Sequence, residues 1–329
     1  EYSLDELVQK GPAGSRPRGK KSIAILIGAA AGLAVVIMAF VLISSRSKQV
    51  EAMAYEFSMQ DGNKMQLYSG EYTGEWKSNK PYRQGSFSYE DTDNSDNSFV
   101  YEGEWEDGLA NGQGIMTWAN DAVYEGEFAG GKRNGQGTMT WTNGAVYEGG
   151  WKDGNRSGQG TMTWTNGAVY EGEWKDGNRS GQGTYTFAED NKNGTRDYVG
   201  QWENDRPNGQ GTMTWINGNV YEGEWKDGVR NGQGTMTLVK GEAYVGGWKE
   251  GKRDGEGTMT YAKDDKYNRR DYTGQWENDK PSGQGTMTWT NGNVYEGEWK
   301  DGLRDGYGKH TAADGTVHEG TWKEDKFVG

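Results

Sequence analysis

The sequence has no cysteine and only two histidines and five prolines among its 329 residues. Without cysteine, the chain can form neither disulfides nor thiolate metal sites. The two histidines stand near the C-terminal end, and no nucleophile elbow or phosphate-cradling loop before a helix is present. These absences predict a protein that is not an enzyme and that has no cofactor.

Large aliphatic side chains are also scarce outside one stretch near the start of the chain. The remainder is rich in glycine and aromatic residues, since the chain has 55 Gly, 15 Trp and 19 Tyr. A conventional core of Leu, Ile and Val is therefore excluded. The glycines have no three-residue period, which excludes collagen, and the aromatic residues are too frequent for a disordered chain. The composition indicates a repetitive, β-rich structure.

Positive charge is concentrated at the N-terminus and is outnumbered elsewhere. Residues 1–50 hold seven Lys/Arg and three Asp/Glu, so residues 51–329 hold 29 and 46, a net charge of −17. Such an acidic domain repels nucleic acid and anionic lipid, which both bind through Lys and Arg. Nucleic acid is therefore excluded as a general partner, and a cationic partner fits better.

One long apolar run, residues 22–45, contains 24 residues without a charge. At about 1.5 Å per residue, a helix of this length crosses the roughly 30 Å core of a bilayer. A cleaved signal peptide is the alternative, but its apolar region has only about 7–15 residues. We therefore predict a basic linker over 1–21, a single transmembrane helix over 22–45, a linker over 46–67 and a repeat domain over 68–329.

The residues in and around this run predict its orientation and one contact. More Lys and Arg precede it, at positions 16, 18, 20 and 21, than closely follow it. By the positive-inside rule, the N-terminus then lies on the cytoplasmic side and the repeat domain on the opposite side of the membrane. Gly28 and Gly32 form a stripe of small residues on one helix face, which is a candidate contact for a second membrane helix.

The rest of the chain is built from a repeat that opens with Y-x-G-x-W. Its copies begin at Tyr72, Tyr101, Tyr124, Tyr147, Tyr170, Tyr198, Tyr221, Tyr244, Tyr272 and Tyr295, with a partial copy at His318. Most copies span 23 residues and continue with G-x-G, a T-M-T-W-like run and usually an N-G pair. These are two strand signals and two turn signals per copy, so each copy is predicted to be a β-hairpin.

The register within one hairpin follows from residues 137–151. A two-residue Asn-Gly loop would scatter aromatic and acidic side chains over both faces. A three-residue loop over 142–144 places Met139 opposite Tyr147 and requires a left-handed conformation at Gly144. One face of the hairpin then carries Tyr, Trp, Met and Gly, and the other carries Thr, Val and Glu.

An aromatic face must be covered, yet the repeat supplies no helix and no second sheet. Glycines in every strand leave room for the Tyr and Trp rings of neighbouring copies to lie along the sheet surface. We therefore predict an all-β fold, an elongated, curved, single-sheet antiparallel meander of β-hairpin repeats, preceded by the transmembrane α-helix. At about 4.8 Å per strand, ten copies give a ribbon ~90–100 Å long.

The pattern Y-E-G-E-W-x-x-G-x-x-x-G-x-G, as in residues 170–183, resembles the MORN repeat. The resemblance covers residues 68–326, with about ten full copies and a partial C-terminal one. It implies the same curved meander, and roles in scaffolding, membrane tethering or dimerisation, with lipid-head-group binding proposed for some members. The first copy departs from the pattern, because Gln84 and Gly85 stand where other copies have G-x-G. Such a departure suits a terminal repeat.

Three spacings are longer than 23 residues, and the additional residues fall in the loop that connects one copy to the next. These insertions are residues 90–98, 188–196 and 262–270. Loops of this kind share one edge of a meander, so a partner could contact all three from one side. Neutral variation of loop length is the alternative. The candidate partner-binding residues in the insertions are Glu90, Asp91, Asp93, Glu189, Asp190, Lys192, Asp264, Asp265 and Tyr267.

The first insertion partly matches a calcium-binding loop. The candidate ligands are Asp91, Asp93, Ser95 and Glu102. The match is weak, because Asp96 stands where such a loop needs glycine and Glu102 belongs to a repeat strand. We predict no metal site and keep these four residues as a weak candidate.

Pairs of glutamates recur in the first strand of the copies. Glu171 with Glu173, and Glu222 with Glu224, are predicted to align in rows on one face together with their equivalents in other copies. The rows either keep this face solvated and prevent aggregation, or they bind a basic partner surface with a salt-sensitive affinity.

The sequence therefore favours a membrane-anchored scaffold or accessory subunit that binds a protein partner within a larger membrane complex. The alternative is a glycan- or envelope-binding module that uses the aromatic face. Recognition of lipid head groups is a third option, which the net charge of the repeat domain disfavours. The sequence gives no oligomeric state.

Overall fold

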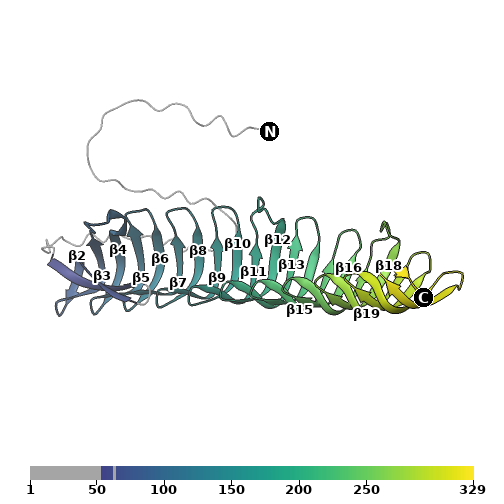
Figure 1. The fold of residues 1–329 in the computed structure, drawn as a ribbon. Helices are drawn as coiled ribbons and strands as arrows, with labels where there is room; N and C mark the ends of the chain where they lie inside the picture. Colours follow the sequence, from purple (N-terminus) through teal and green to yellow (C-terminus); the bar gives the residue numbers. More distant parts are fainter. Residues whose placement is uncertain (1–52, 62–63) are drawn as a thin grey trace, which may run out of the picture. The chain divides into compact units, whose positions relative to one another are not determined.

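The computed structural model describes residues 53–61 and 64–329, which belong to one structural unit. Twenty-three strands form a single sheet, and one short 3-10 helix, η1 (Ser95–Asn97), lies in a loop. Each strand pairs antiparallel with its neighbours in the chain, so the sheet is a meander (Figure 1). The described residues contain no α-helix. The predicted all-β meander is confirmed.

The ten copies that open at Tyr72 to Tyr295 each supply two strands, and a partial copy ends the sheet. The strands are β1 (Met53–Asp61), β2 (Lys64–Lys77), β3 (Lys80–Tyr89), β4 (Phe99–Glu106), β5 (Leu109–Trp118), β6 (Val123–Ala129), β7 (Lys132–Thr140), β8 (Val146–Lys152), β9 (Asn155–Thr163), β10 (Val169–Lys175), β11 (Asn178–Thr186), β12 (Thr195–Glu203), β13 (Arg206–Trp215), β14 (Val220–Lys226), β15 (Val229–Thr237), β16 (Ala243–Lys249), β17 (Lys252–Thr260), β18 (Arg269–Glu277), β19 (Lys280–Trp289), β20 (Val294–Lys300), β21 (Leu303–Thr311), β22 (Val317–Lys323) and β23 (Lys326–Phe327).

The sheet begins earlier than the sequence predicts. A linker is predicted over 46–67, but β1 and the first part of β2 lie in this range and pair from Met53 opposite Tyr72 to Asp61 opposite Lys64. The physical reason is the alternation of Tyr, Phe and Met with Ala, Glu and Ser along β1, which is the period of a strand. This segment lacks Y-x-G-x-W, so the repeat signature does not include it. The prediction of a linker is wrong for these strand residues.

The predicted N-terminal linker, 1–21, and the predicted transmembrane helix, 22–45, lie outside the described residues, and so do Gly28 and Gly32. Among the residues that the structure does describe, no helix has the length and apolarity needed to span a bilayer. The membrane helix and its orientation stay predictions.

Two kinds of connection alternate along the sheet. Within a copy, two residues with positive φ connect the strands, such as Asp153 (50°) and Gly154 (85°). This is the conformation of a type I′ turn, which Asp-Gly and Asn-Asp pairs favour. Between copies, the connection is a longer loop. We call the two sides of the ribbon the turn edge and the loop edge, and the loop edge is uppermost in Figure 1.

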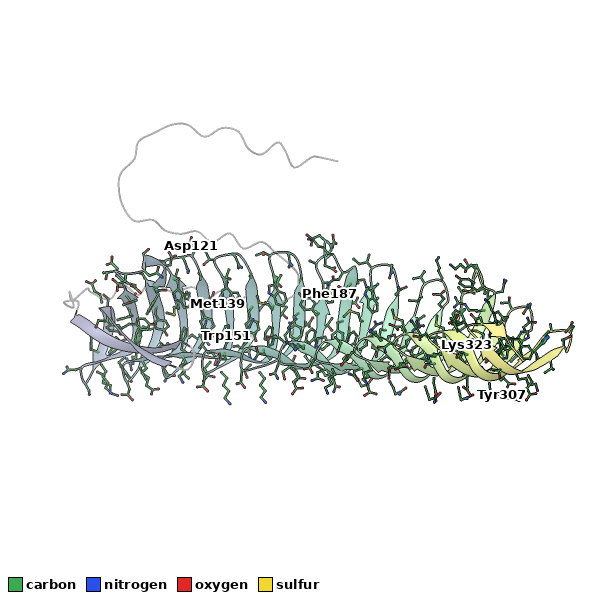
Figure 2. All side chains as sticks on the ribbon, in the orientation of Figure 1. Asp121, Met139, Trp151, Phe187, Tyr307 and Lys323 are labelled. Atoms are coloured by element: carbon green, nitrogen blue, oxygen red, sulfur yellow. The ribbon has the colours of Figure 1, made fainter. Side chains whose placement is uncertain are left out.

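The predicted register is confirmed in the hairpin from which it was derived. Met139 lies opposite Tyr147, the Trp141 N–H donates to the Ala145 carbonyl at 2.9 Å, and Gly144 has a φ of 85°. We call the face that carries Tyr147 the inner face and the opposite face the outer face. Figure 2 shows Met139 and Trp151 within the bend of the sheet and Tyr307 projecting from the other side.

Candidate partner-binding surfaces

The inner face is a continuous ladder of aromatic rings. Tyr147 lies between Trp151 of its own copy and Trp174 of the next, with ring centroids 5.2 and 5.3 Å away and nearly perpendicular planes. The same relation recurs from Tyr72 to Trp322. Such edge-to-face pairs each contribute roughly 0.5–1.5 kcal/mol beyond the burial of their area. Because Tyr147 is fully buried, these rings are the core of the repeat.

The polar atoms of these rings bind the backbone. The Tyr147 hydroxyl donates to the Gly150 carbonyl at 3.0 Å, and the Trp151 indole N–H donates to the Gly137 carbonyl at 3.1 Å. Burial raises the pKa of Tyr147 to about 12, so its hydroxyl remains a donor at neutral pH. The ladder therefore holds the sheet together and leaves these rings no face for a sugar.

Glycine makes the room for each ring. A Cβ atom on Gly160 would lie 2.3 Å from the Tyr147 hydroxyl oxygen, and one on Gly149 would lie 2.4 Å from the Gly160 Cα. Neither position has space for a side chain. The prediction that rings lie over strand glycines is confirmed.

In the eight copies that open at Tyr101 to Tyr272, one side chain lies at the border between the inner face and the loop edge, just after the T-M-T run or its equivalent. We call this set the rim row: Trp118, Trp141, Trp164, Phe187, Trp215, Leu238, Tyr261 and Trp289. All are half-buried, and the aromatic members pack against the ring ladder. The rim row is therefore the part of the aromatic face that a partner can reach.

A ladder of arginines covers the rings, and it was not predicted from the sequence. The guanidinium of Arg156 lies 4.2 Å from the Trp174 ring centroid, and its Nη2 donates to the Gly177 carbonyl at 2.7 Å. Where an Asn-Asp turn replaces Asp-Gly, Arg179 instead binds the Asp205 carboxylate, with Nε 3.0 Å from Oδ1. The signal was an arginine recurring two residues before the G-x-G, at positions 133, 156, 179, 230, 253 and 304. These cations are bound within the sheet, so we do not count them as partner sites.

The glutamate pairs share the outer face, but their two members differ. Glu171 is exposed, whereas the Glu173 carboxylate accepts the Gln182 N–H at 3.0 Å. Glu224 accepts the Gln233 N–H in the same way, at 2.9 Å. In these copies the second glutamate therefore holds the bulge of its hairpin and the first is displayed, whereas in the last pair Glu298 is exposed as well. Of the four predicted residues, Glu171 and Glu222 can meet a partner, and the structure assigns Glu173 and Glu224 to packing.

The three insertions all lie on the loop edge. Each is attached to the following loop by one backbone hydrogen bond of 2.8 Å, from Ala119 to Ser98, from Ile216 to Gly194 and from Thr290 to Asn268. We name them loop 1 (90–98), loop 2 (188–196) and loop 3 (262–270). One side of the ribbon therefore presents all three.

Loop 1 is organised by one of the residues proposed to bind calcium. The Asp91 carboxylate accepts the Asn94 N–H at 2.9 Å, the Asn97 amide at 3.2 Å and the Asp93 N–H at 3.0 Å, and these bonds lower its pKa. Glu102 lies in β4, exposed on the outer face. The structure does not bring the four candidate ligands together, and within the described ranges no three His, Asp or Glu side chains are grouped for a metal. Glu90 borders a hollow of about 490 Å³ on the outer face of the sheet.

Loops 2 and 3 are closed by equivalent internal contacts. In loop 2, the Asn191 amide oxygen accepts both the N–H and the hydroxyl of Thr195, each at 3.0 Å. In loop 3, the Asp265 carboxylate accepts the Arg269 N–H at 3.0 Å and pairs with its guanidinium at 2.8 Å. Hydrogen bonds from Arg269 therefore lower the pKa of Asp265 to about 2.

Asp265 is thus a structural residue, although its position in an insertion suggested a partner contact. Its side chain is 7% exposed. The other candidates of these loops are exposed, namely Glu189, Asp190, Lys192, Asp264 and Tyr267. These five remain available to a partner.

The family model described as MORN repeat matches ten segments of the chain. They are residues 72–93, 101–123, 124–146, 147–169, 170–192, 198–220, 221–242, 244–266, 272–294 and 295–317. These segments coincide with the ten copies read from the sequence. A search of curated proteins found no match.

Solved structures give weak similarities. The TCP10 domain of Danio rerio CPAP has a TM-score of 0.24 at 10% identity, over 72% of this chain and 96% of that chain. The SAS-4 TCP domain of Drosophila melanogaster, solved with a proline-rich motif of Ana2, has a TM-score of 0.21 at 12% identity, over 64% of this chain and 90% of that chain. Similarities at this level carry no argument about partners.

Proposed function

The chain belongs to the MORN-repeat family, and from this premise we propose that it is a membrane-anchored scaffold or accessory subunit that binds a protein partner. Repeats of this family build scaffolds that commonly take part in binding. In this proposal the partner contacts the repeat sheet and the long loops of the loop edge. The proposal includes no catalysed reaction and no cofactor.

The observation that carries the proposal is the division of the repeat into packed and displayed side chains. The inner rings, the arginine ladder and second glutamates such as Glu173 bind one another or the backbone. The first glutamates, such as Glu171, are exposed in a row, and loops 1 to 3 stand on one edge. A ribbon that fixes its own core and repeats its exposed groups is suited to presenting surface.

The aromatic face gives less support to a glycan-binding module. Sugar recognition needs exposed ring faces, but the ladder tyrosines are buried and the ladder indoles bind carbonyls, so only the half-buried rim row offers rings to a sugar. Retention of the chain on a polysaccharide column that survives high salt would favour the glycan module over the scaffold.

Support for the membrane anchor comes from residues 22–45 of the sequence. We expect the full chain to stay in the membrane pellet after alkaline carbonate extraction, and a chain without 22–45 to be released. Protease added to intact cells or vesicles should reach the repeats only from the side opposite the cytoplasm. Release of the full chain by carbonate would remove the anchor from the proposal and leave the scaffold.

Partner binding can be tested by extracting the full chain in mild detergent and identifying what co-purifies after crosslinking. In one variant, residues 188–196 are replaced by the Thr-Asn-Gly-Ala connection found at 165–168. In a second, Glu125, Glu171 and Glu222, which are all exposed, become Gln. The matched control changes Glu127, Glu173 and Glu224 to Gln, which removes the same charge from the same strands. We expect a several-fold loss of a specific partner in at least one test variant and none in the control. Absence of any specific partner, or equal recovery with all three, would overturn the proposal.

A further inference from the structure

Two loops between loop 2 and loop 3 depart from the other copies. After the rim residue, short copies have Thr142, Thr165 or Thr290, but this stretch has Ile216 in one loop and Val239 in the next. These two residues are 56% and 65% exposed. Exposure alone is not distinctive, since Val199 and Val245 are 50% and 55% exposed, but two aliphatic residues in adjacent loops, where other copies have threonine, form a candidate contact surface.

These residues form one patch along the loop edge. The Ile216 N–H donates to Gly194 of loop 2 at 2.8 Å, and the Val239 N–H donates to the Asn219 side chain at 3.2 Å. The order along the edge is therefore loop 2, the Ile216 loop, the Val239 loop and then loop 3. Loops 2 and 3 thus flank the aliphatic patch on its two sides.

A cavity opens beside the patch on the inner face. Its volume is about 320 Å³, and its lining includes Arg230, Met236, Leu238, Trp248, Arg253 and Met259. The rim row explains the space, because Leu238 stands where most copies have Trp, as at Trp141 and Trp215. An indole in this row packs on the ring ladder. The cavity beside Leu238 is therefore a space that an aromatic ring of the chain fills in most other copies.

On its loop 3 side the patch has a charge opposite to that of the domain, whereas the acids Glu189 and Asp190 of loop 2 are offset by Lys192 and Arg196. Residues 261–270 hold four Lys/Arg and two Asp, in a repeat domain whose net charge is −17. Lys263 and Lys266 are exposed in loop 3, and Lys240 is exposed beside Val239. Inside the cavity, Arg253 pairs with Asp279 at 3.1 Å, Arg230 binds the Gly251 carbonyl, and Glu242 is the remaining acid.

We propose that this patch binds a protein segment in which an aromatic side chain, flanked by acidic residues, enters the Leu238 cavity. The aromatic ring takes the place that an indole of the chain occupies in other copies. The acidic flanks face Lys240, Lys263 and Lys266, and the aliphatic side chains of Ile216 and Val239 cover the segment between them. The inference rests on the proposed scaffold function and assigns one of its binding sites.

The test uses the full chain in detergent and three fluorescein-labelled peptides, with binding followed by fluorescence anisotropy. The first has a central tryptophan between acidic residues, the second replaces the tryptophan by alanine, and the third has basic residues in place of the acidic ones. We expect saturable binding of the first peptide, at least tenfold weaker binding of the second, and weakening of the first by salt. Failure of the first peptide to bind, or equal binding of the first two, would overturn the inference.

Three variants locate the site. Leu238→Trp restores the common residue and fills the cavity, so we expect at least a tenfold loss of affinity for the first peptide. The double change I216T and V239T restores the threonine of other copies and should cost about fivefold. Thr165→Ser, in a loop outside the patch, is the control and should have no effect. Because each patch variant installs a residue that the fold accepts elsewhere, unchanged circular dichroism is expected, and unchanged affinity in both patch variants contradicts the assignment.

Failure of this inference is distinguishable from failure of the proposed function. If the co-purifying partner of the full chain is retained by Leu238→Trp but lost when the first-row glutamates are changed, the scaffold stands and this site is wrong. If no variant changes the partner and no peptide binds, both are wrong.

Discussion

The carboxylate of Glu173 accepts the backbone N–H of Gln182 at 3.0 Å, across the bulge of its hairpin. In the next copy a neutral side chain does the same, because the Gln201 amide oxygen accepts the Gln210 N–H at 2.7 Å. Where a side chain makes this bond, it therefore needs an acceptor oxygen and not a negative charge, and glycine takes the position in two other copies, at Gly150 and Gly247. The contribution of such a side chain is a hydrogen bond to a backbone donor that would otherwise depend on solvent.

This relation predicts a difference between two substitutions of Glu173. Glu173→Gln keeps the acceptor and should change the free energy of unfolding by a few tenths of a kcal/mol, whereas Glu173→Ala should lower it by about 1 kcal/mol. Urea unfolding followed by tryptophan fluorescence measures both. Glu171→Ala, on the exposed row, is the control and should be nearly neutral. Equal loss in the Gln and Ala variants would show that charge, and not the acceptor, matters here.

A second prediction concerns the two reasons why this chain needs glycine. Gly160 lies under the Tyr147 ring, whereas Gly167 is in a loop with a φ of 84° and nothing within 4 Å of an added Cβ. Gly160→Ala forces the ring out of place and should cost about 3 kcal/mol. Gly167→Ala only strains the backbone and should cost about 1 kcal/mol.

Thermal unfolding of the two variants beside the unaltered chain separates these effects. The larger fall in melting temperature should belong to Gly160→Ala, and its near-ultraviolet circular dichroism should weaken as the ladder is disturbed. If Gly167→Ala proves the more damaging, loop conformation and not ring packing limits the stability of the repeat.

The sequence predicted those features that are local and recurrent. The register from Met139 to Tyr147 followed from one hairpin, because only one loop length segregates rings from carboxylates. The ring-over-glycine packing followed from the same pattern. The order of the loops along one edge also followed, because a meander permits no other arrangement.

Contacts between neighbouring copies could not be predicted from the sequence of a single copy. Arg156 contacts Gly177, which is 21 residues away, and a recurrent arginine on a polar strand looks like a solvated residue. The two glutamates of a pair look alike, although the bulge gives Glu173 a backbone partner and leaves Glu171 exposed. The closing role of Asp265 needed the loop conformation, which an insertion sequence alone does not specify.

The arginine ladder gives a third prediction. Arg156→Lys keeps the charge near Trp174 but loses the planar group that stacks and donates to Gly177 at once. We expect a loss of about 1 kcal/mol in the free energy of unfolding, with Arg156→Met losing at least as much. The midpoints of urea unfolding measure this loss of stability. Arg196→Lys, at an exposed site, is the control. No change in Arg156→Met would mean that the guanidinium adds nothing to the ladder.

The last prediction is a pH dependence in loop 3. Arg269 holds the pKa of Asp265 at about 2, below its ordinary value of 3.8. A depressed pKa stabilises the loop above the ordinary value, and this contribution is lost as the pH falls from about 4 through about 2. Asp265→Asn should therefore loosen loop 3 at neutral pH, and its difference from the unaltered chain should shrink over that interval.

Hydrogen exchange of the peptide that contains 262–270, corrected for intrinsic rates, measures this loosening locally, because Asp265 accepts the N–H groups of Tyr267 and Arg269. The matched variant carries D265N together with R269T, which reproduces the Asn191 and Thr195 contact of loop 2. It keeps an acceptor without a titrating group, so it should regain protection at neutral pH and show none of the acid-dependent loss. If D265N alone is as protected as the unaltered chain at neutral pH, the ion pair does not close the loop, and Asp265 returns to the set of residues that a partner can bind.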